Sequence, residues 1–301
     1  MPNIKRHYSA EKSSYFVRSL SKISHKGWEL YVISRILHLL DDPDIEFVCQ
    51  QQVRKSDGKR YLVDLYFPQL KMYIEVDEAQ HFSPDHIQFD KLRQREILEV
   101  ANIDERRVPV YEPGRNSYRS LSEVNSDVEK LLEEIRTRKA EQIEAKNFLR
   151  WDISDRYNSQ NYISNGFISV EGNVAVRRQV DALKIFGADF KGYQRGWWDI
   201  KGTDKAVWFP RLYTSKNWTN SLSEDGLKIT EMRSDKSIIS GDGAPETDRV
   251  VFGHYKNALG ETVYKFVGLF RFDAKASSSL RHVHRRISPK IDIRKFQQDA
   301  R

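Results

Sequence analysis

The chain has 301 residues, a formal net charge of +7 and a mean hydropathy of −0.67. Its one cysteine, Cys49, excludes an intramolecular disulfide and a cysteine-rich zinc site. No apolar run approaches the ~20 residues of a membrane-spanning helix, and the N-terminus lacks the apolar segment of a secretory signal. We therefore expect a cytoplasmic protein with no membrane partner, and the length favours two domains.

The excess positive charge lies in the second half of the chain. Residues 1–150 contain 25 Lys and Arg against 25 Asp and Glu, whereas residues 151–301 contain 25 against 18. Nine basic and three acidic residues fall between Arg271 and Arg301. This stretch is either an ordinary basic tail or a surface that contacts phosphates. We favour phosphate contacts, because clustered Lys and Arg attract polyanions.

The first part of the chain predicts a mixed sheet flanked by helices, in the order α-β-β-β-α-β. Its first ~20 residues follow no regular pattern. Apolar residues then recur at helical spacing until Pro43, which disfavours a helical conformation in the residue before it. Alternating apolar runs rich in Val, Ile, Tyr and Phe indicate the strands. The expected elements are helices at 26–42 and 85–103, strands at 45–53 and 106–113, and a hairpin at 61–81.

The remaining residues predict a long charged helix followed by a mainly β domain. The helix, at 120–146, is predicted to be amphipathic. Apolar residues are sparse beyond Ile135, so its later turns are expected to be solvated, which suits a linker between domains. After Asn147, glycine and aromatic residues become frequent. Strand-like runs follow at 205–213, 249–256 and 262–272. We expect an α/β domain at 1–119, a helical linker at 120–147 and a barrel-like β domain at 148–301.

Three carboxylates converge in the expected hairpin. If its strands pair symmetrically about Gln69-Leu70, Asp64 lies opposite Glu75, with Cβ atoms about 5 Å apart. Asp77 then projects from the same face as Glu75. Carboxylates at this density repel unless a cation neutralises them, and such hard oxygen ligands suit Mg²⁺ or Mn²⁺. The alternative is a set of solvated acids at the strand ends.

Glu29, on the first helix, could complete the shell of metal ligands, although it could equally be an ordinary exposed helix acid. Glu78 is expected to have a structural or capping role. A bound metal would neutralise a scissile phosphate and lower the pKa of an attacking water. The sequence therefore indicates phosphodiester hydrolysis.

The order Asp…Glu-x-Asp is a variant of the nuclease pattern Asp…Glu-x-Lys, the PD-(D/E)xK type. The lysine of that pattern helps to position or deprotonate the water, and here Asp77 stands in its place. We therefore expect the general base elsewhere. His81, which follows Gln80 at the exit of the strand, is the candidate.

Aromatic and basic residues alternate between residues 192 and 226. Core packing is the simpler interpretation for Trp197, Trp198 and Trp208. Trp218 and Asn220 lie in a Ser/Thr-rich loop, where an aromatic ring is less expected in a core. His282 and His284 could mimic a metal pair, but no third ligand is evident, so we expect them beside phosphates or in a groove.

The segments WELYVISRILHLLDD, VDLYFPQL and YIEVDEAQH resemble the N-terminal domain of the PvuRts/AbaS-type modification-dependent restriction endonucleases. Enzymes of that family join a very-short-patch-repair-like nuclease domain to a C-terminal SRA-like domain of the PUA-like barrel type. They cleave DNA at a distance from 5-hydroxymethylcytosine or its glucosylated form. The resemblance carries Asp64, Glu75, Asp77 and His81 onto the catalytic core.

The same resemblance implies a pocket for a flipped cytosine in residues 148–301. An acidic residue there could accept a hydrogen bond from the cytosine amino group or from a 5-hydroxymethyl group. The expected pocket residues are Trp218, Asn220, Asp235, Tyr213 and Asn217. DNA contacts are expected from Gln194, Arg195, Lys216, Arg281, Arg285 and Arg286.

The sequence thus predicts a Mg²⁺-dependent or Mn²⁺-dependent endonuclease that cleaves double-stranded DNA near a modified cytosine. A homodimer is expected, since two strands need two active sites. One alternative is a mismatch-repair-like nicking nuclease. The other is a non-catalytic reader of modified cytosine, in which Glu75-x-Asp77 marks a degenerate nuclease site.

Overall fold

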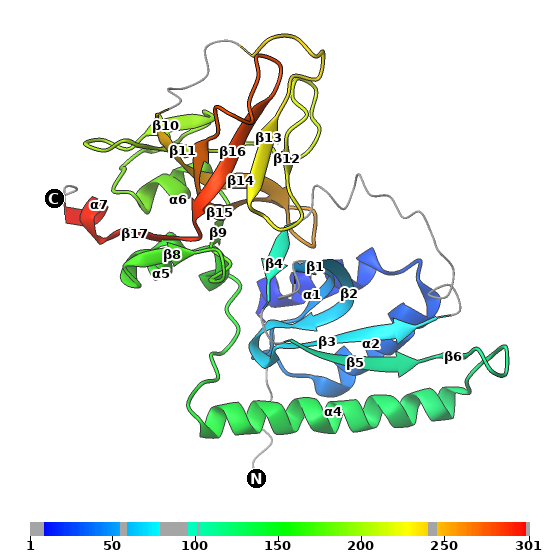
Figure 1. Ribbon diagram of the computed structural model, residues 1–301. Helices are drawn as coiled ribbons and strands as arrows, with labels where there is room; N and C mark the ends of the chain where they lie inside the picture. The colour runs from blue at the N-terminus through cyan, green and yellow to red at the C-terminus, as the bar shows by residue number, and fades with distance from the viewer. Residues whose placement is uncertain (1–8, 55–58, 79–95, 101–102, 240–245, 299–301) are drawn as a thin grey trace. The chain divides into compact units, whose positions relative to one another are not determined.

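The computed structural model describes residues 9–54, 59–78, 96–100, 103–239 and 246–298 (Figure 1). The chain forms two compact units. No helix in these described ranges is long and apolar enough to span a membrane. The first unit comprises Met1–Lys55, Tyr61–Ile87 and Val100–Ile153, and the second comprises Ser56–Arg60, Gln88–Glu99 and Ser154–Arg301.

The first unit is a mixed α/β structure, as predicted. Its strands lie side by side in the order β1-β2-β3-β5. The hairpin strands β2 and β3 are antiparallel, whereas β3 and β5 are parallel. The elements are α1 (Ala10–Lys22), α2 (Gly27–Leu40), β1 (Val48–Arg54), β2 (Arg60–Phe67), η1 (Pro68–Leu70), β3 (Met72–Asp77), β5 (Asp104–Pro109), β6 (Tyr111–Glu112), β7 (Ser117–Tyr118) and α4 (Leu121–Glu144).

The hairpin has the register expected from its sequence. Leu65 pairs with Ile74 and Phe67 with Met72, across a 3-10 turn that begins at Pro68. Proline suits this position because its φ is fixed in the helical range. The paired residues end at Leu65 and Ile74, and the same register continued by one residue sets Asp64 level with Glu75. The side chains of these two acids are hydrogen-bonded, in line with the predicted opposition.

The long helix α4 is part of the first unit's core. Ser120 caps it, accepting a hydrogen bond from the Glu123 amide, and the Glu123 side chain accepts in return from the Ser120 amide. The apolar face of α4 is buried as far as Ile135. It belongs to the same hydrophobic cluster as the apolar face of α2. This burial agrees with the amphipathic helix predicted there, and the range 120–147, expected as a linker between domains, belongs to the first unit.

Two local expectations for residues 1–119 are wrong. Residues 10–22, within the opening stretch expected to be irregular, form α1, which is capped by the Ser9 side chain. Residues 97–99, expected in a helix, form strand β4 (Ile97–Glu99). Most of the helix expected at 85–103 lies outside the described residues. A tertiary partner accounts for β4: the Glu99 N–H donates to Asn173 Oδ1 at 2.8 Å, and Asn173 Nδ2 donates to the Glu99 carbonyl at 2.9 Å.

The second unit is rich in sheet, which confirms the prediction for this half of the chain. Seven strands run in the order β10-β11-β14-β15-β16-β13-β12, and β9 pairs with β15. The predicted hairpin around Asn257-Ala258-Leu259-Gly260 joins β14 to β15. The elements are η3 (Asp155–Tyr157), α5 (Ser159–Ser164), β8 (Phe167–Ser169), β9 (Ala175–Val176), α6 (Gln179–Lys184), β10 (Trp197–Asp199), β11 (Lys205–Trp208), β12 (Ser221–Leu222), β13 (Lys228–Glu231), β14 (Asp248–Lys256), β15 (Thr262–Phe272), β16 (His282–Ser288), β17 (Lys290–Asp292) and α7 (Arg294–Gln298).

Candidate functional site

The carboxylates of the hairpin and of α2 share one buried amide. Gln50 Nε2 donates to Glu29 Oε1 at 2.7 Å and to Asp64 Oδ1 at 2.8 Å. The second oxygen of Asp64 accepts from the Val76 amide at 2.9 Å. Glu29, Gln50 and Asp64 are all buried. Asp64 is therefore held rigidly from two sides, and Glu29 lies within reach of the same amide.

Gln50 is a site residue that the sequence did not reveal. It lies inside β1 with a φ of 56°, in the left-handed region that non-glycine residues rarely adopt. Such a conformation persists only where the surrounding structure imposes it, and it is common at functional sites. One Gln among the three consecutive glutamines of β1 carries no local signal of this role, since its partners are distant along the chain.

The carboxyl groups of Glu75 and Glu29 hold protons more tightly than isolated acids. Burial, followed by the charge and hydrogen bond of Asp64, raises the pKa of Glu75 to about 9. Burial, followed by the charge of Asp64, raises the pKa of Glu29 to about 7. This cluster therefore carries more negative charge than its own surroundings neutralise.

Asp77 has a different environment from Asp64 and Glu75. Arg107, on the parallel strand β5, is level with Glu75 and donates from Nη1 to Asp77 Oδ1 at 2.6 Å. The Arg107 Nε donates to Glu105 Oε1, also at 2.6 Å. The positive charge that Lys would supply in a Glu-x-Lys motif is thus present beside the motif, from the neighbouring strand.

Glu78 contacts the start of α2, in line with the structural role expected for it. Its Oε1 accepts from the Glu29 amide at 3.0 Å, which satisfies an N–H at the helix N-terminus. Lys26 forms a 2.6 Å ion pair with Glu29 Oε2. This ion pair lowers the pKa of Glu29 against the larger effects of burial and Asp64.

Within the described ranges, no three His, Cys, Asp or Glu side chains are grouped so that they could hold a metal ion. The chemistry of Glu29, Asp64 and Glu75 nevertheless fits a hard divalent cation. All three supply carboxylate oxygens, and the raised pKa values of Glu29 and Glu75 reflect charge that a cation would neutralise. The candidate catalytic residues His81 and Gln80 lie outside the described residues.

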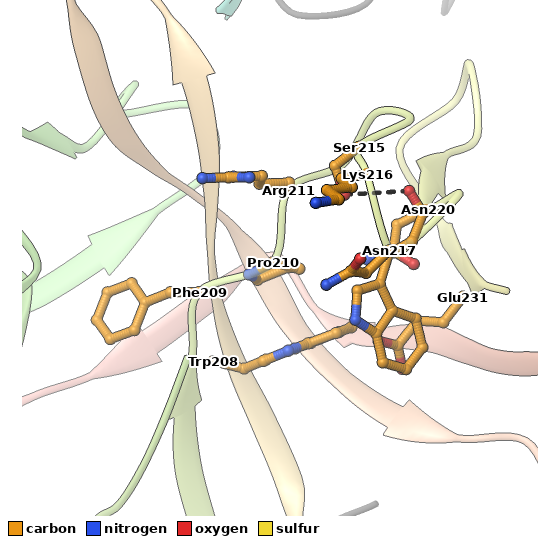
Figure 2. A pocket seen from close by; sticks show the side chains of 10 residues that line it. Trp208, Phe209, Pro210, Arg211, Ser215, Lys216, Asn217, Asn220 and Glu231 are labelled. Carbon is orange, nitrogen blue, oxygen red and sulfur yellow. Dashed lines mark hydrogen bonds between the residues drawn. The ribbon is translucent and has the colours of Figure 1, made fainter. Parts of the chain in front are cut away.

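The second unit contains a pocket of about 360 Å³ in the region predicted to hold a base. Four of the residues expected in the pocket or at DNA line it: Trp218, Asn220, Asn217 and Lys216. Figure 2 shows the lining side chains gathering from segment 208–220 and from β13. The remaining lining residues are Trp208, Phe209, Pro210, Arg211, Ser215 and Glu231.

Asn220 presents an acceptor to this pocket. It is buried, and among the described residues its Oδ1 has no hydrogen-bond partner. A buried carbonyl oxygen without a partner costs stability, so a ligand that donates a hydrogen bond would compensate for it. Trp218 lies beside it as an aromatic surface, with the Arg233 guanidinium 5.3 Å from its ring centroid.

Glu231, at the end of β13, is the acid that lines the pocket. The structure places Asp235 in an exposed turn, where it accepts from the amide and hydroxyl of Ser237, and these bonds lower its pKa. Tyr213 bonds His254 Nδ1 at 2.7 Å and is not among the lining residues of the 360 Å³ pocket. Roles for Asp235 and Tyr213 at the base remain predictions.

The residues expected at DNA phosphates have varied surroundings. Gln194 and Arg195 are exposed in a loop before β10. Arg285 is exposed and pairs with Asp273 at 2.5 Å. The exposed Arg281 donates to the Ala276 carbonyl at 3.3 Å. The aliphatic part of Arg286 lies over Gly268, close to where a Cβ atom would be.

The expectation that His284 meets a phosphate or groove is wrong. Its side chain is 0% exposed, and its ring contacts Glu231, Arg249 and Trp208 inside the sheet. Its neighbours on β16 are the buried Val283 and the exposed Arg285, so burial of His284 follows from its contacts with β13 and β14 and not from alternation along the strand. The basic composition of the segment concealed this inward position.

Comparison with known proteins defines the class. Residues 13–159 match the family model for the N-terminal domain of PvuRts1I-like restriction endonucleases, and residues 161–293 match the SET and RING associated (SRA) domain. The chain is therefore a restriction endonuclease, a DNA-cleaving enzyme with a separate SRA domain that binds modified DNA.

The particular family follows from a solved structure, described as the 5-hydroxymethylcytosine-specific restriction enzyme AbaSI. It is 34% identical to this chain, with a TM-score of 0.76, and the match covers 94% of this chain and 98% of that one. A search of curated proteins finds no match. This chain belongs to the PvuRts1I-like, modification-dependent restriction endonucleases, which confirms the resemblance seen in its sequence.

Proposed function

We propose that this enzyme cleaves double-stranded DNA at a distance from 5-hydroxymethylcytosine or its glucosylated form. The observation that carries the proposal is the pocket in the SRA domain, where Asn220 and Glu231 present acceptors beside Trp218. Its volume of about 360 Å³ suits a small ligand such as a base. The similarity to AbaSI supports 5-hydroxymethylcytosine as the modification.

Base extrusion follows from the position of the target atoms. The edge and the 5-substituent of a paired cytosine cannot enter a pocket while the base remains stacked in the duplex. In the proposed complex, Trp218 stacks on the extruded base, while Asn220 Oδ1 and Glu231 accept hydrogen bonds from its amino group or 5-hydroxymethyl group. Lys216 and Asn217 lie at the same pocket and bond the sugar-phosphate backbone.

In the nuclease unit, Asp64, Glu75 and Glu29 would hold Mg²⁺ or Mn²⁺. The bound cation would neutralise the scissile phosphate and acidify the attacking water. Gln50 and the Val76 amide orient Asp64, and Glu78 with Lys26 positions Glu29. His81, with Gln80 beside it, remains the proposed general base.

Arg107 would take part of the role that Lys has in the Glu-x-Lys motif. It holds Asp77 as an ion pair and presents a cation next to Glu75, where negative charge on the phosphate increases during cleavage. Asp77 would then orient Arg107 in addition to, or in place of, binding metal. Two such centres are needed to cut both strands, so we propose that the enzyme acts as a homodimer.

A digestion experiment tests this function. Phage DNA containing glucosylated 5-hydroxymethylcytosine, the hydroxymethylated form, 5-methylcytosine DNA and unmodified DNA would be incubated with Mg²⁺, with Mn²⁺ or with EDTA. We expect double-strand cleavage of the first two substrates only, and only with a divalent cation. Cleavage that ignores the modification would contradict the proposal.

Two other outcomes identify the alternatives. Binding of modified DNA without cleavage in any metal indicates a non-catalytic reader. Conversion of a modified supercoiled plasmid to the nicked circle and no further indicates a nicking nuclease. Sedimentation analysis with and without modified duplex tests the homodimer separately.

A further inference from the structure

Three buried polar side chains meet behind the wall of the base pocket. Glu231 Oε2 lies 2.9 Å from His284 Nε2 and 3.4 Å from Arg249 Nη1. The same His284 nitrogen is 2.9 Å from Arg249 Nη1. Glu231 is 8% exposed, Arg249 3% and His284 0%. Only Glu231 of the three lines the pocket, so the other two reach a bound base through it.

The network is assembled from three strands and two tryptophans. Glu231, Arg249 and His284 come from β13, β14 and β16 respectively. The Arg249 guanidinium lies 5.3 Å from the Trp197 ring centroid and 5.0 Å from that of Trp208. Trp208 also lines the pocket and packs against His284. The guanidinium is therefore fixed between aromatic faces, with its charge directed to Glu231.

The charges of the network define what Glu231 offers to a ligand. Burial chiefly, and Arg249 in addition, lower the pKa of His284, so its imidazole is neutral. A neutral imidazole carries one N–H, and His284 Nε2 lies 2.9 Å from both Glu231 Oε2 and Arg249 Nη1. One tautomer donates from Nε2 to Glu231, and the other accepts at Nε2 from Arg249, so in either form His284 holds a member of the pair in place. Arg249 supplies positive charge beside Glu231 Oε2, and the Glu231 side chain lines the pocket.

We propose that Arg249 and His284 are positioning residues that fix the Glu231 side chain as a hydrogen-bond acceptor in the pocket, so that the pocket selects bases presenting a donor there. This inference rests on the proposed function of the pocket in holding a flipped base. Burying an Arg–Glu pair is a poor way to stabilise a sheet, since apolar residues of similar size stabilise it as well or better. Its position at the pocket wall gives it a specificity role.

The test measures discrimination, the ratio of Kd values for unmodified duplex and for the same duplex with one central 5-hydroxymethylcytosine. The full-length protein would be titrated by fluorescence anisotropy in EDTA, which prevents cleavage. The variants are Glu231→Gln, Arg249→Met, Arg249→Lys and His284→Gln. Arg271→Met is the matched control, because Arg271 pairs with Asp248, which precedes Arg249 on β14 and points to the opposite face.

We expect Glu231→Gln and Arg249→Met to lose about tenfold or more in discrimination, since a buried hydrogen bond to a charged group is removed or misdirected. His284→Gln should retain part of it, because its amide N–H can still donate to Glu231. Arg249→Lys should also retain part of it, because it keeps the charge. Arg271→Met should discriminate like the wild type.

A double-mutant cycle separates positioning from a merely structural role. If Arg249 acts through Glu231, adding Arg249→Met to Glu231→Gln should cost little further discrimination. A structural role would lower stability and affinity in both backgrounds alike. Thermal melting and circular dichroism check the fold. If Arg249→Met does not fold, the Arg249→Lys and His284→Gln cycles with Glu231→Gln give the same test.

The outcomes distinguish this inference from the proposed function. A wild-type protein that binds both duplexes equally overturns both. The positioning role alone is overturned if the wild type discriminates and the Arg249 and His284 variants discriminate equally well. It is also overturned if the losses in these variants add independently to the loss in Glu231→Gln.

Discussion

The two units each bury a carboxylate at their candidate site, but they neutralise it differently. In the SRA domain, Glu231 has its own buried cation in Arg249 and a hydrogen-bond partner in His284. In the nuclease unit, Asp64 and Glu75 lie together, and burial, followed by the charge of Asp64, raises the pKa of Glu75 to about 9. The SRA carboxylate thus has its counter-charge within the fold. At the nuclease centre the proposed divalent cation would supply that counter-charge.

Removing Asp64 should have the largest effect. Asp64→Ala takes away the carboxylate between Gln50 and Glu75, so we expect cleavage to fall by about 10³-fold or more, as for loss of a group that acts in the transition state. Binding to modified duplex in EDTA should not change, because the SRA pocket is intact. Asp127→Asn is the control, because Asp127 is an acid on α4 that forms an ion pair with Arg119. Cleavage by Asp64→Ala at the wild-type rate would place the chemistry elsewhere.

Arg107 tests whether the nuclease centre uses a cation of its own. Arg107→Ala should lower the cleavage rate about 10–100-fold, the range for one electrostatic contact to a developing charge, and Arg107→Lys should recover part of it. Arg106→Ala is the matched control, because Arg106 precedes it on β5 and pairs with Glu134 on α4. Equal losses in the two alanine variants would indicate that Arg107 acts only through stability.

Trp218 tests the opposite site. Trp218→Ala should weaken binding of the modified duplex by about 1–3 kcal/mol, the usual contribution of base–aromatic stacking. Binding of unmodified duplex should change much less, since it uses phosphate contacts. Trp198→Phe, at a half-buried ring in the domain core, is a control for aromatic packing. If both duplexes lose affinity equally, Trp218 does not stack on the modified base.

The pH dependence of stability should separate the two kinds of carboxylate. Glu75, with a pKa raised to about 9, binds a proton in the folded protein that it loses on unfolding. Its contribution to stability is therefore full at low pH and is lost as pH rises through about 9. In EDTA, the melting temperature should decline as the pH is raised from about 6 to about 9, because this interval lies between the ordinary pKa of a Glu carboxyl and the raised pKa of Glu75. Mg²⁺ should reduce the decline, and Glu75→Gln should flatten it.

The Glu231 network provides the contrast for that experiment. Its carboxylate is already paired with Arg249, so Mg²⁺ should not change the effect of Glu231→Gln on melting. A Mg²⁺ response that disappears in Glu231→Gln and persists in Glu75→Gln would reverse the assignment of the two sites.

Local sequence patterns predicted the elements that depend on neighbours along the chain. Symmetric pairing about the turn that begins at Pro68 correctly predicted that Asp64 lies opposite Glu75, because a short hairpin fixes its own register. The pattern failed for Ile97–Glu99 and for residue His284. The strand at Ile97–Glu99 and the burial of His284 both depend on the segment that packs alongside. The same residue types also occur in helices and on basic surfaces, so the local sequence could not distinguish these cases.

The sequence by itself determined the class of this enzyme, its two-part organisation and its central carboxylates, since periodicity, turn chemistry and motif spacing are local properties. Only the tertiary structure decided the partners of those carboxylates. Arg107 reaches Asp77 across a parallel pair, Gln50 reaches Glu29 and Asp64 through an unusual backbone angle, and three strands bring Arg249 and His284 to Glu231. Contacts between residues far apart in the chain follow from how strands pack, and no local pattern records that packing.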